Sequence, residues 1–262
     1  MALFTVTYRS DVLKRDINFK AVFPYDFLPD FGDGGKKKLK TLYMLHGLNH
    51  NYESWLKESR FDRLARDLGM AVVFPDGQNS FYVEGPGPNS DFGKLVGEEL
   101  VNFTRSVFPL SDKREDTFIG GFSMGGFGAL RNGLKYADTF SKIIAFSSAV
   151  HMFEFKPGDP KRNIVCNEDM VFGDYDEAVI SDKNPAVCLK MLSEKVREGK
   201  ASFPKVYMIC GLQDGLLEAN RSFRDKLLDE GVDVIYREYE GIHSHEFVNE
   251  HLKDVLTWMM GD

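Results

Sequence analysis

The chain has 262 residues, of which 43% are hydrophobic and 28% are charged, a balance that is ordinary for a globular protein. This length allows one α/β domain with a large core. The net charge of −7 argues against nucleic acid or an anionic membrane surface as the main partner. No apolar stretch approaches the length that spans a membrane, so we expect no membrane association.

The predicted elements alternate between strands and helices along the chain. Strands are expected at 4–9, 17–23, 39–45, 71–74, 116–120, 143–146, 206–210 and 232–239, and helices at 60–68, 92–108, 126–135, 218–229 and 246–259. A polar turn joins the first two strands, which predicts an antiparallel start to the sheet. Apolar strands that alternate with amphipathic helices predict a mostly parallel sheet with helices on both faces, an α/β fold.

The alternation lapses between about 151 and 200, where Pro, Gly, Asp and Asn separate short helical pieces. We interpret this segment as a small cap-like insertion over the carboxyl edge of the sheet, where ligands bind in such folds. The chain shows neither a composition break nor an internal repeat. We therefore expect a single domain over 1–262.

The sequence G-F-S-M-G at 121–125 lies between an expected strand and an expected helix. At a strand-to-helix turn, G-x-S-x-G is the nucleophile elbow of α/β-hydrolases, because the glycines permit a sharp bend that raises the serine hydroxyl above the sheet. The pattern alone is common, but the order of strand, turn and helix makes it specific. It predicts an α/β-hydrolase fold with Ser123 as the nucleophile.

A serine hydroxyl needs a neighbouring base that is itself oriented by a third group, and in this fold the order is Ser, acid, His. His243 follows the last expected strand, at the same sheet edge as Ser123. His245 is the competing base, but its place nearer the helix start favours a capping or pocket-wall role. His151 precedes the expected acid, and His251 falls within the closing helix. We therefore expect His243 to be the base.

Asp214 follows the strand at 206–210 and stands beside a glycine. An ordinary turn aspartate would have this pattern too. The order Ser, Asp, His instead favours Asp214 as the acid that orients the imidazole.

Two backbone N–H groups are expected to bind the oxyanion, one from Met124 and one from Leu48 in the loop after the third strand.

Several longer strings agree with one known family. They are L-H-G at 45–47 with Trp55, D-G-Q-N-S-F-Y at 76–82, G-E-E-L at 97–100, G-F-S-M-G-G-F-G-A at 121–129, C-G at 210–211 with Asp214, and G-I-H at 241–243. The chain resembles the esterase D-like (putative esterase) family of α/β-hydrolases, closest to tributyrin esterase and to acetyl and feruloyl esterases. The resemblance spans nearly the whole chain and implies the triad Ser123, Asp214 and His243.

The resemblance implies a serine carboxylesterase that hydrolyses short-chain acetyl or hydroxycinnamoyl (feruloyl) esters through an acyl-enzyme. It implies no cofactor and no metal, and a small-molecule ester as the partner. We expect His46, Ser80, Tyr82 and His245 at the substrate pocket. Family members often carry an acidic and then an aromatic residue after the catalytic histidine, whereas this chain has Ser244 and His245, which leaves the acyl preference open.

Other functions agree less well with the residues. S-formylglutathione hydrolase, a thioester-cleaving relative, uses the same machinery, so the sequence leaves it open. A catalytically inactive hydrolase-fold binding protein would have lost a triad residue, and all three are present. A dinucleotide-binding fingerprint, G-x-G-x-x-G, could begin at Gly126 and Gly128, but Arg131 stands where the third glycine is required. A zinc site is disfavoured because H-E-x-x-H is missing.

Three cysteines, Cys166, Cys188 and Cys210, cannot all pair with one another. An odd and sparse set without C-x-x-C fits a reducing compartment. The first residues show no basic leader followed by an apolar core, so we expect no secretory signal. The expected location is therefore the cytoplasm. By analogy with relatives, a homo-oligomer is possible.

Overall fold

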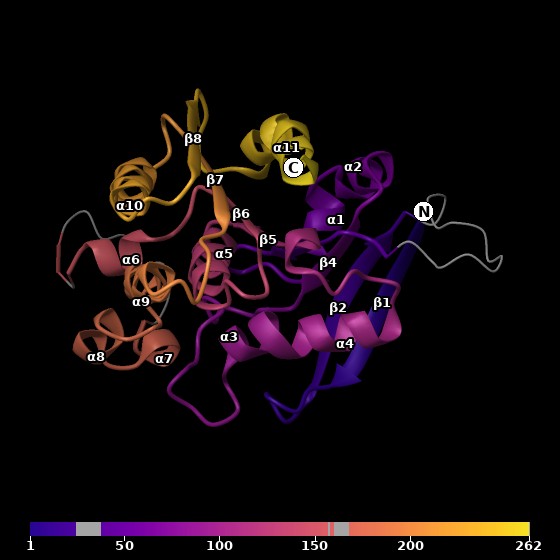
Figure 1. Cartoon of the computed structure of the whole chain (residues 1–262), viewed down its shortest axis with the longest axis horizontal. Coiled ribbons are helices and arrows are strands. Elements are labelled where there is room, and N and C mark those ends of the chain that lie inside the picture. The colour runs from indigo at the N-terminus through magenta and orange to yellow at the C-terminus, as the bar shows by residue number, and fades with distance from the viewer. Residues whose placement is uncertain (25–37, 157, 160–167, 262) are drawn as a thin grey trace.

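The computed structural model describes residues 1–24, 38–156, 158–159 and 168–261. Eight strands form one sheet in the order β1-β2-β4-β3-β5-β6-β7-β8 (Figure 1). They are β1 (Ala2–Arg9), β2 (Asp16–Phe23), β3 (Thr41–Leu45), β4 (Ala71–Pro75), β5 (Thr117–Phe122), β6 (Lys142–Phe146), β7 (Lys205–Gly211) and β8 (Val234–Tyr239). The pairs β1–β2 and β2–β4 are antiparallel, and the other pairs are parallel. The predicted mostly parallel sheet with an antiparallel start is confirmed.

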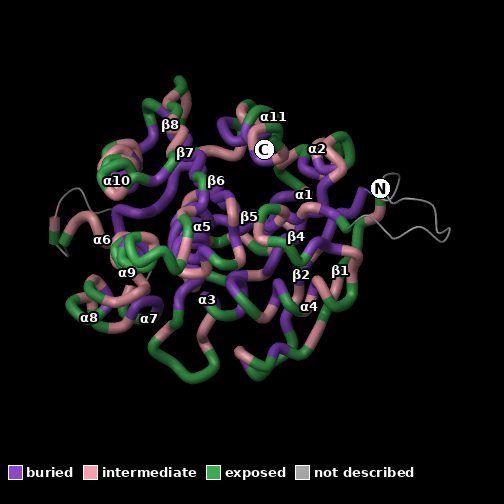
Figure 2. The backbone as a smooth tube through the Cα atoms, viewed as in Figure 1, coloured by how far each residue is buried: buried purple, intermediate pink, exposed green. Residues whose placement is uncertain are grey.

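Helices cover both faces of this sheet, as predicted. The helices are α1 (Ser54–Glu58), α2 (Phe61–Leu68), α3 (Phe92–Lys94), α4 (Leu100–Val107), α5 (Met124–Lys135), α6 (His151–Glu154), α7 (Glu168–Phe172), α8 (Tyr175–Val179), α9 (Pro185–Arg197), α10 (Leu217–Asp229) and α11 (His245–Met260). The apolar residues of α4, α5, α9 and α10 pack on one face, and those of α1, α2 and α11 on the other. The buried backbone is accordingly concentrated in the central strands (Figure 2).

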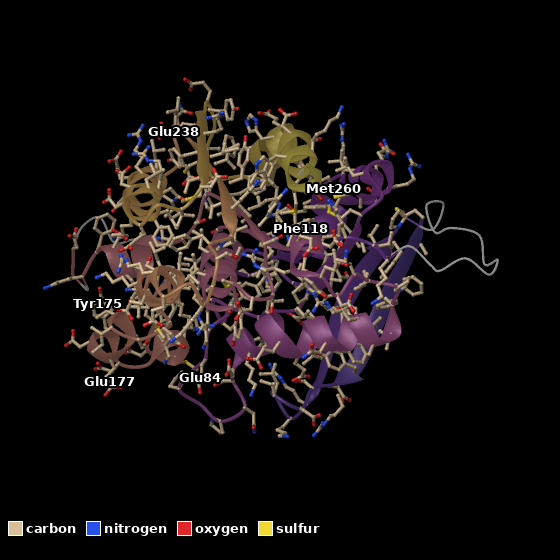
Figure 3. All side chains as sticks on the ribbon, in the orientation of Figure 1. Glu84, Phe118, Tyr175, Glu177, Glu238 and Met260 are labelled. Atoms are coloured by element: carbon tan, nitrogen blue, oxygen red, sulfur yellow. The ribbon has the colours of Figure 1, made fainter. Side chains whose placement is uncertain are left out.

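Side chains along each strand alternate between the two cores, because successive residues of a strand point to opposite faces. On β5, Phe118 belongs to the core under α11, whereas Ile119 belongs to the core under α5. Figure 3 shows Phe118 in the interior near Met260 at the end of α11, and the two residues share one apolar cluster. The central strands are therefore apolar on both faces, which explains their continuous hydrophobic runs.

The helix expected over 92–108 is interrupted by a π-helical segment, Leu95–Glu99, between α3 and α4. Glu99 ends this segment and reaches the turn between β1 and β2. Its carboxylate accepts hydrogen bonds from the Ser10 hydroxyl at 3.1 Å and from the N–H groups of Asp11 and Val12 at 3.1 and 2.7 Å. Glu99 thus connects the helical layer to the antiparallel start of the sheet.

The segment between β6 and β7 contains the short helices α6, α7 and α8 and the longer helix α9, which packs on α5. Residues 157 and 160–167 of this segment lie outside the described residues. The buried guanidinium of Arg131 on α5 donates to the backbone oxygen of Asp182 at 2.8 Å and to its carboxylate at 3.2 Å. This contact ties the segment to the helix that follows the elbow. Its role as a cap, and the single domain, stay predictions.

Two of the three cysteines, Cys188 and Cys210, are free and buried, and Cys166 lies outside the described residues. Burial raises the pKa of the Cys188 thiol to about 11 and that of the Cys210 thiol to about 12. Both thiols therefore stay protonated near neutral pH. Among the helices in the described part of the chain, none combines the length and the apolar composition that crossing a membrane requires.

Replacement of Glu99 by Ala should destabilise the fold, because three donors in the β1–β2 turn would lose their acceptor. Two of these hydrogen bonds are partly buried, so the free energy of unfolding should fall by about 1–3 kcal/mol. Urea denaturation measures this loss. The exposed neighbour Glu98 provides the control, since Glu98→Ala should change the same quantity by less than about 0.5 kcal/mol. Equal effects of both changes would contradict the assignment.

Candidate active site

Ser123 occupies a sharp turn between β5 and α5, with φ 59° and ψ −116°. A Cβ atom on Gly121 would lie 2.2 Å from the backbone of Gly125, and a Cβ atom on Gly125 would lie 2.2 Å from the backbone oxygen of Leu45. Only glycine allows the strand and helix backbones to approach so closely. The positive φ of a serine costs on the order of 1–3 kcal/mol and persists because its surroundings hold it.

Backbone hydrogen bonds hold this turn to the next strand. The Ser123 N–H donates to the oxygen of Phe146 at 3.0 Å, and the Ala149 N–H donates to the oxygen of Ser123 at 3.0 Å. Both partners belong to the end of β6 and the loop after it. The main chain of Ser123 is therefore fixed on both sides, and its side chain lines a cavity.

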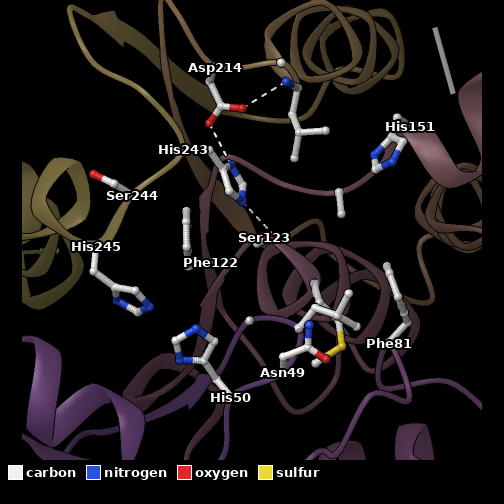
Figure 4. Close-up of a pocket in the computed structure, with 16 residues that line it drawn as sticks. Asn49, His50, Phe81, Phe122, Ser123, His151, Asp214, His243, Ser244 and His245 are labelled. Atoms are coloured by element: carbon white, nitrogen blue, oxygen red, sulfur yellow. Dashed lines mark hydrogen bonds and ion pairs between the residues drawn. The ribbon is translucent and has the colours of Figure 1, made fainter. Parts of the chain in front are cut away.

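Ser123, His243 and Asp214 are joined by two hydrogen bonds (Figure 4). The Ser123 Oγ lies 2.9 Å from His243 Nε2, and His243 Nδ1 lies 2.8 Å from Asp214 Oδ2. The three residues come from the loops after β5, β8 and β7, at the carboxyl ends of parallel strands. These are the distances at which a base can accept a proton from a hydroxyl while a carboxylate orients the base.

The Asp214 side chain is 1% exposed, yet its carboxyl group stays ionised. Burial alone would raise the pKa of Asp214. The hydrogen bond and the charge of His243, together with the Leu216 N–H that donates to Oδ1 at 2.9 Å, outweigh burial and hold this pKa below its ordinary value. Asp214 can therefore accept the Nδ1–H of His243 and face an imidazolium at neutral pH.

A pair of hydrogen bonds connects the loop of the acid to the loop of the base. The Gln213 N–H donates to the oxygen of Gly241 at 3.0 Å, and the Gly241 N–H donates to Gln213 Oε1 at 2.7 Å. Two residues beyond Gly241, His243 is followed by Ser244, whose hydroxyl accepts from the Phe247 N–H at 3.2 Å and caps α11. Gln213 was not predicted from the sequence, because no local pattern indicates a hydrogen bond to a loop 28 residues away.

The triad side chains open into a cavity of about 630 Å³. Figure 4 shows Phe81 and His151 on one side of the line from His243 to Ser123, and His50 and His245 on the other. The cavity is large enough for an ester with a short acyl group and a sizeable alcohol.

Leu48 and Met124, the expected oxyanion donors, both line this cavity. Met124 begins α5, so its N–H is one of the helix-start amides that have no partner within the helix. The loop of Leu48 is fixed by its neighbour, because the Asn49 N–H donates to Asn79 Oδ1 at 2.8 Å and Asn79 Nδ2 donates to Asn49 Oδ1 at 3.0 Å. That the two amides bind the same oxyanion stays a prediction.

Three expected pocket residues, His46, Ser80 and Tyr82, do not line the cavity in the described structure, which corrects that expectation. The His46 ring is 1% exposed, and its Nε2 accepts from the Gly77 N–H at 2.9 Å. The buried Tyr82 hydroxyl donates to the oxygen of His46 at 3.0 Å, and the Ser80 hydroxyl donates to the oxygen of Gly77 at 2.6 Å. The polar atoms of these three side chains form hydrogen bonds with backbone groups, and these bonds hold the loops behind the cavity wall.

His245 does line the cavity, and its side chain is 11% exposed. Its ring packs against His50 and Trp55, with ring centroids 5.0 and 5.3 Å apart. Burial lowers the pKa of His245, although the carboxylate of Glu58, 3.9 Å from Nε2, opposes this. His245 is therefore a neutral wall residue, and the hydrogen bond to Ser123 comes from His243.

The two remaining histidine candidates lie apart from the triad. His151 begins α6 and lines the cavity opposite His245. His251, on α11, stacks on Tyr239 with ring centroids 4.1 Å apart. Within the residues that the structure describes, no group of three or more His, Cys, Asp or Glu side chains could hold a metal ion.

The sheet order, the serine at the turn between β5 and α5, and the triad loops at one sheet edge define an α/β-hydrolase. Two solved structures from Staphylococcus aureus share this fold over the whole chain. The substrate-bound fluorophosphonate-binding serine hydrolase FphF has a TM-score of 0.86 and 27% identity, covering 100% of this chain and 99% of that one. The apoenzyme of S-formylglutathione hydrolase FrmB has a TM-score of 0.84 and 27% identity, covering 99% of each.

The model of the family described as "Putative esterase" matches residues 10–259, and the chain belongs to this family. A protein named acetyl esterase from Caldicellulosiruptor saccharolyticus is 42% identical over 267 aligned positions, which cover 99% of this chain and 98% of that protein. The protein is thus a carboxylic ester hydrolase, as the sequence predicted. The family resemblance is confirmed.

Replacement of Gly125 by Ala should damage the elbow, because the added methyl group would lie 2.2 Å from a backbone oxygen of β3. Strand and helix would have to separate, which should lower the free energy of unfolding by about 1–3 kcal/mol and reduce ester hydrolysis. Calorimetry and a 4-nitrophenyl acetate assay measure the two effects. Gly87→Ala is the control, since a Cβ there meets no atom within 4 Å. Normal stability and activity of Gly125→Ala would contradict this account of the turn.

Proposed function

We propose that the protein is a serine esterase that hydrolyses short-chain acyl esters, above all acetyl esters, through an acyl-enzyme on Ser123. The observation that carries the proposal is the continuous chain of hydrogen bonds from Asp214 through His243 to Ser123 Oγ. An inactive binding protein would have no need of this alignment. The family of the chain is in agreement with the proposal.

In the acylation step, His243 Nε2 accepts the proton of Ser123 as Oγ attacks the ester carbonyl carbon. The carbonyl oxygen becomes an oxyanion, and the N–H groups of Leu48 and Met124 stabilise it. Asp214 stabilises the imidazolium that forms. The tetrahedral intermediate collapses when its C–O bond to the alcohol breaks and His243 donates its proton to the departing oxygen.

In the deacylation step, the same groups act on a water molecule in place of Ser123. His243 Nε2 accepts a proton from the water, whose oxygen attacks the acyl carbon. The second oxyanion is bound by the same two amides. Collapse breaks the bond to Ser123 Oγ, which recovers its proton from His243, and the carboxylic acid leaves. The ester has then consumed one water and the enzyme is unchanged.

Two observations favour an acetyl ester over S-formylglutathione as the substrate. The full-length relative at 42% identity is named acetyl esterase. Glutathione carries carboxylates, and none of the described residues that line the cavity is Lys or Arg, while the net charge of the chain is −7. The cavity volume also leaves room for the larger feruloyl group, so the volume does not decide which acyl length is preferred. The cytoplasmic location and a homo-oligomer stay predictions.

Ser123→Ala should lower kcat for 4-nitrophenyl acetate by about three orders of magnitude or more, because removal of a triad member leaves only binding and the oxyanion donors. His243→Ala should have a similar effect. His245→Ala, which removes a wall residue that does not contact Ser123, should cost much less. Steady-state kinetics with circular dichroism as a folding control decide this. The reverse ranking of the two histidines would transfer the base role to His245.

A substrate panel should separate the two enzyme functions. We expect kcat/KM to be highest for 4-nitrophenyl acetate, lower for methyl ferulate and lowest for S-formylglutathione, because the described lining residues offer no Lys or Arg to the carboxylates of glutathione. The Ser123→Ala variant supplies the background rate for each substrate. A preference for S-formylglutathione would instead identify a thioesterase with the same triad.

A further inference from the structure

Phe122, the residue directly before Ser123, lies against one face of the His243 imidazole. The two ring centroids are 4.6 Å apart and the ring planes are inclined by 30°. Phe122 ends β5, is 5% exposed and lines the cavity. Figure 4 shows its ring beside His243, on the side that faces His245.

The Phe122 ring is itself held by two other parts of the site. Its edge meets His245, with ring centroids 5.1 Å apart and planes at 63°. A Cβ atom on Gly47, in the loop of the oxyanion donor Leu48, would lie 3.7 Å from Phe122 Cδ1, which is ordinary contact. The ring therefore lies between the base, the cavity wall and the oxyanion loop, and it cannot move without disturbing them.

The two hydrogen bonds of His243 leave one motion of its ring weakly restrained. Both bonds lie near the plane of the imidazole, at Nδ1 and at Nε2. Rotation about the line between these atoms tilts the ring face while changing either distance little. A packed aromatic ring on that face opposes the tilt. The imidazolium formed during proton transfer also gains from this contact, because an aromatic face attracts a cation within about 6 Å.

We propose that Phe122 is a positioning residue for the catalytic base, which holds the plane of the His243 imidazole and stabilises its protonated form during both proton transfers. This proposal rests on the proposed function, since it needs His243 to be the base. The variable residue of the G-x-S-x-G pattern thus has a defined task in this chain. A leucine or a methionine at 122 would fill space without offering a π face.

The titratable groups around His243 are compatible with this role. The titratable groups that line the cavity with His243, or that act on its neighbour His245, are Asp214, His245, His50, His151, Glu58 and Glu246. Asp214 is the one that His243 contacts directly. Burial lowers the pKa of His245, so at neutral pH the Phe122 ring is next to one developing cation rather than two.

The test is the pH dependence of kcat/KM for 4-nitrophenyl acetate in Phe122→Leu and Phe122→Tyr. For Phe122→Leu we expect a loss of about three- to tenfold near pH 8. Loss of the aromatic face makes the imidazolium easier to deprotonate. The midpoint of the acid limb should therefore move to lower pH, by about half a unit. Phe122→Tyr keeps the face and should stay within about twofold of the wild type, with an unchanged midpoint.

Phe81→Leu is the matched control, because Phe81 lines the cavity on the opposite side of Ser123 and makes its ring contacts with Phe127 and Phe172. Its acid limb should keep the wild-type midpoint. If Phe122→Leu does not fold by circular dichroism, Phe122→Met, which better preserves volume, carries the same expectation.

Two results would overturn the proposal: a wild-type rate and profile in Phe122→Leu, or a reduced rate with an unshifted acid limb, which would indicate packing alone. Failure of the proposed function has a different signature. In that case Ser123→Ala would retain hydrolysis, whatever the behaviour of the Phe122 variants.

Discussion

The contact between the backbones of β5, β3 and α5 at the elbow is the constraint on which the rest of the site depends. Gly121 lies against the backbone of Gly125, and Gly125 lies against the carbonyl oxygen of Leu45. At both contacts the α-hydrogen of glycine fits and a Cβ atom does not. This approach directs Ser123 outward and brings the start of α5 beside the loop that follows β3. This packing arrangement thus places Ser123 and the N–H group of Met124 beside the loop of Leu48, which the Asn49–Asn79 pair holds in turn.

His243 and Asp214 are brought to the same place by the parallel strands. Because β5, β7 and β8 run in one direction, their carboxyl ends meet at one edge, and the loops that follow can exchange hydrogen bonds. The Gln213–Gly241 pair joins the loop of Asp214 to the loop of His243, and the ring contact of Phe122 joins the loop of His243 to the elbow. Each triad residue is therefore oriented by contacts with the loops of the others, in addition to its own strand.

Features that depend on local pattern could be predicted, and features that depend on distant contacts could not. The helix expected at 218–229 is observed as Leu217–Asp229, because its apolar spacing is local. His46 and Tyr82 were misplaced because hydrogen bonds to distant backbone groups hold both side chains inward. The Gly77 N–H donates to His46 Nε2 across 31 residues, and the Tyr82 hydroxyl donates to the backbone oxygen of His46 across 36 residues. His243 lies in the loop before α11 and His245 is the first residue of that helix, and the two side chains point in different directions. The extended backbone of Ser244, the N-cap residue of α11, separates the two and was not readable from the local pattern.

The position of β8 at the edge of the sheet has a consequence for how the enzyme loses activity. Ser123 follows a central strand with a partner on each side, whereas His243 follows a strand that pairs with β7 alone in the described sheet. Edge elements open locally at a lower free energy than central ones. Mild heating or denaturant can thus release His243 while Ser123 is still folded in place. Inactivation should then precede global unfolding and reverse on cooling.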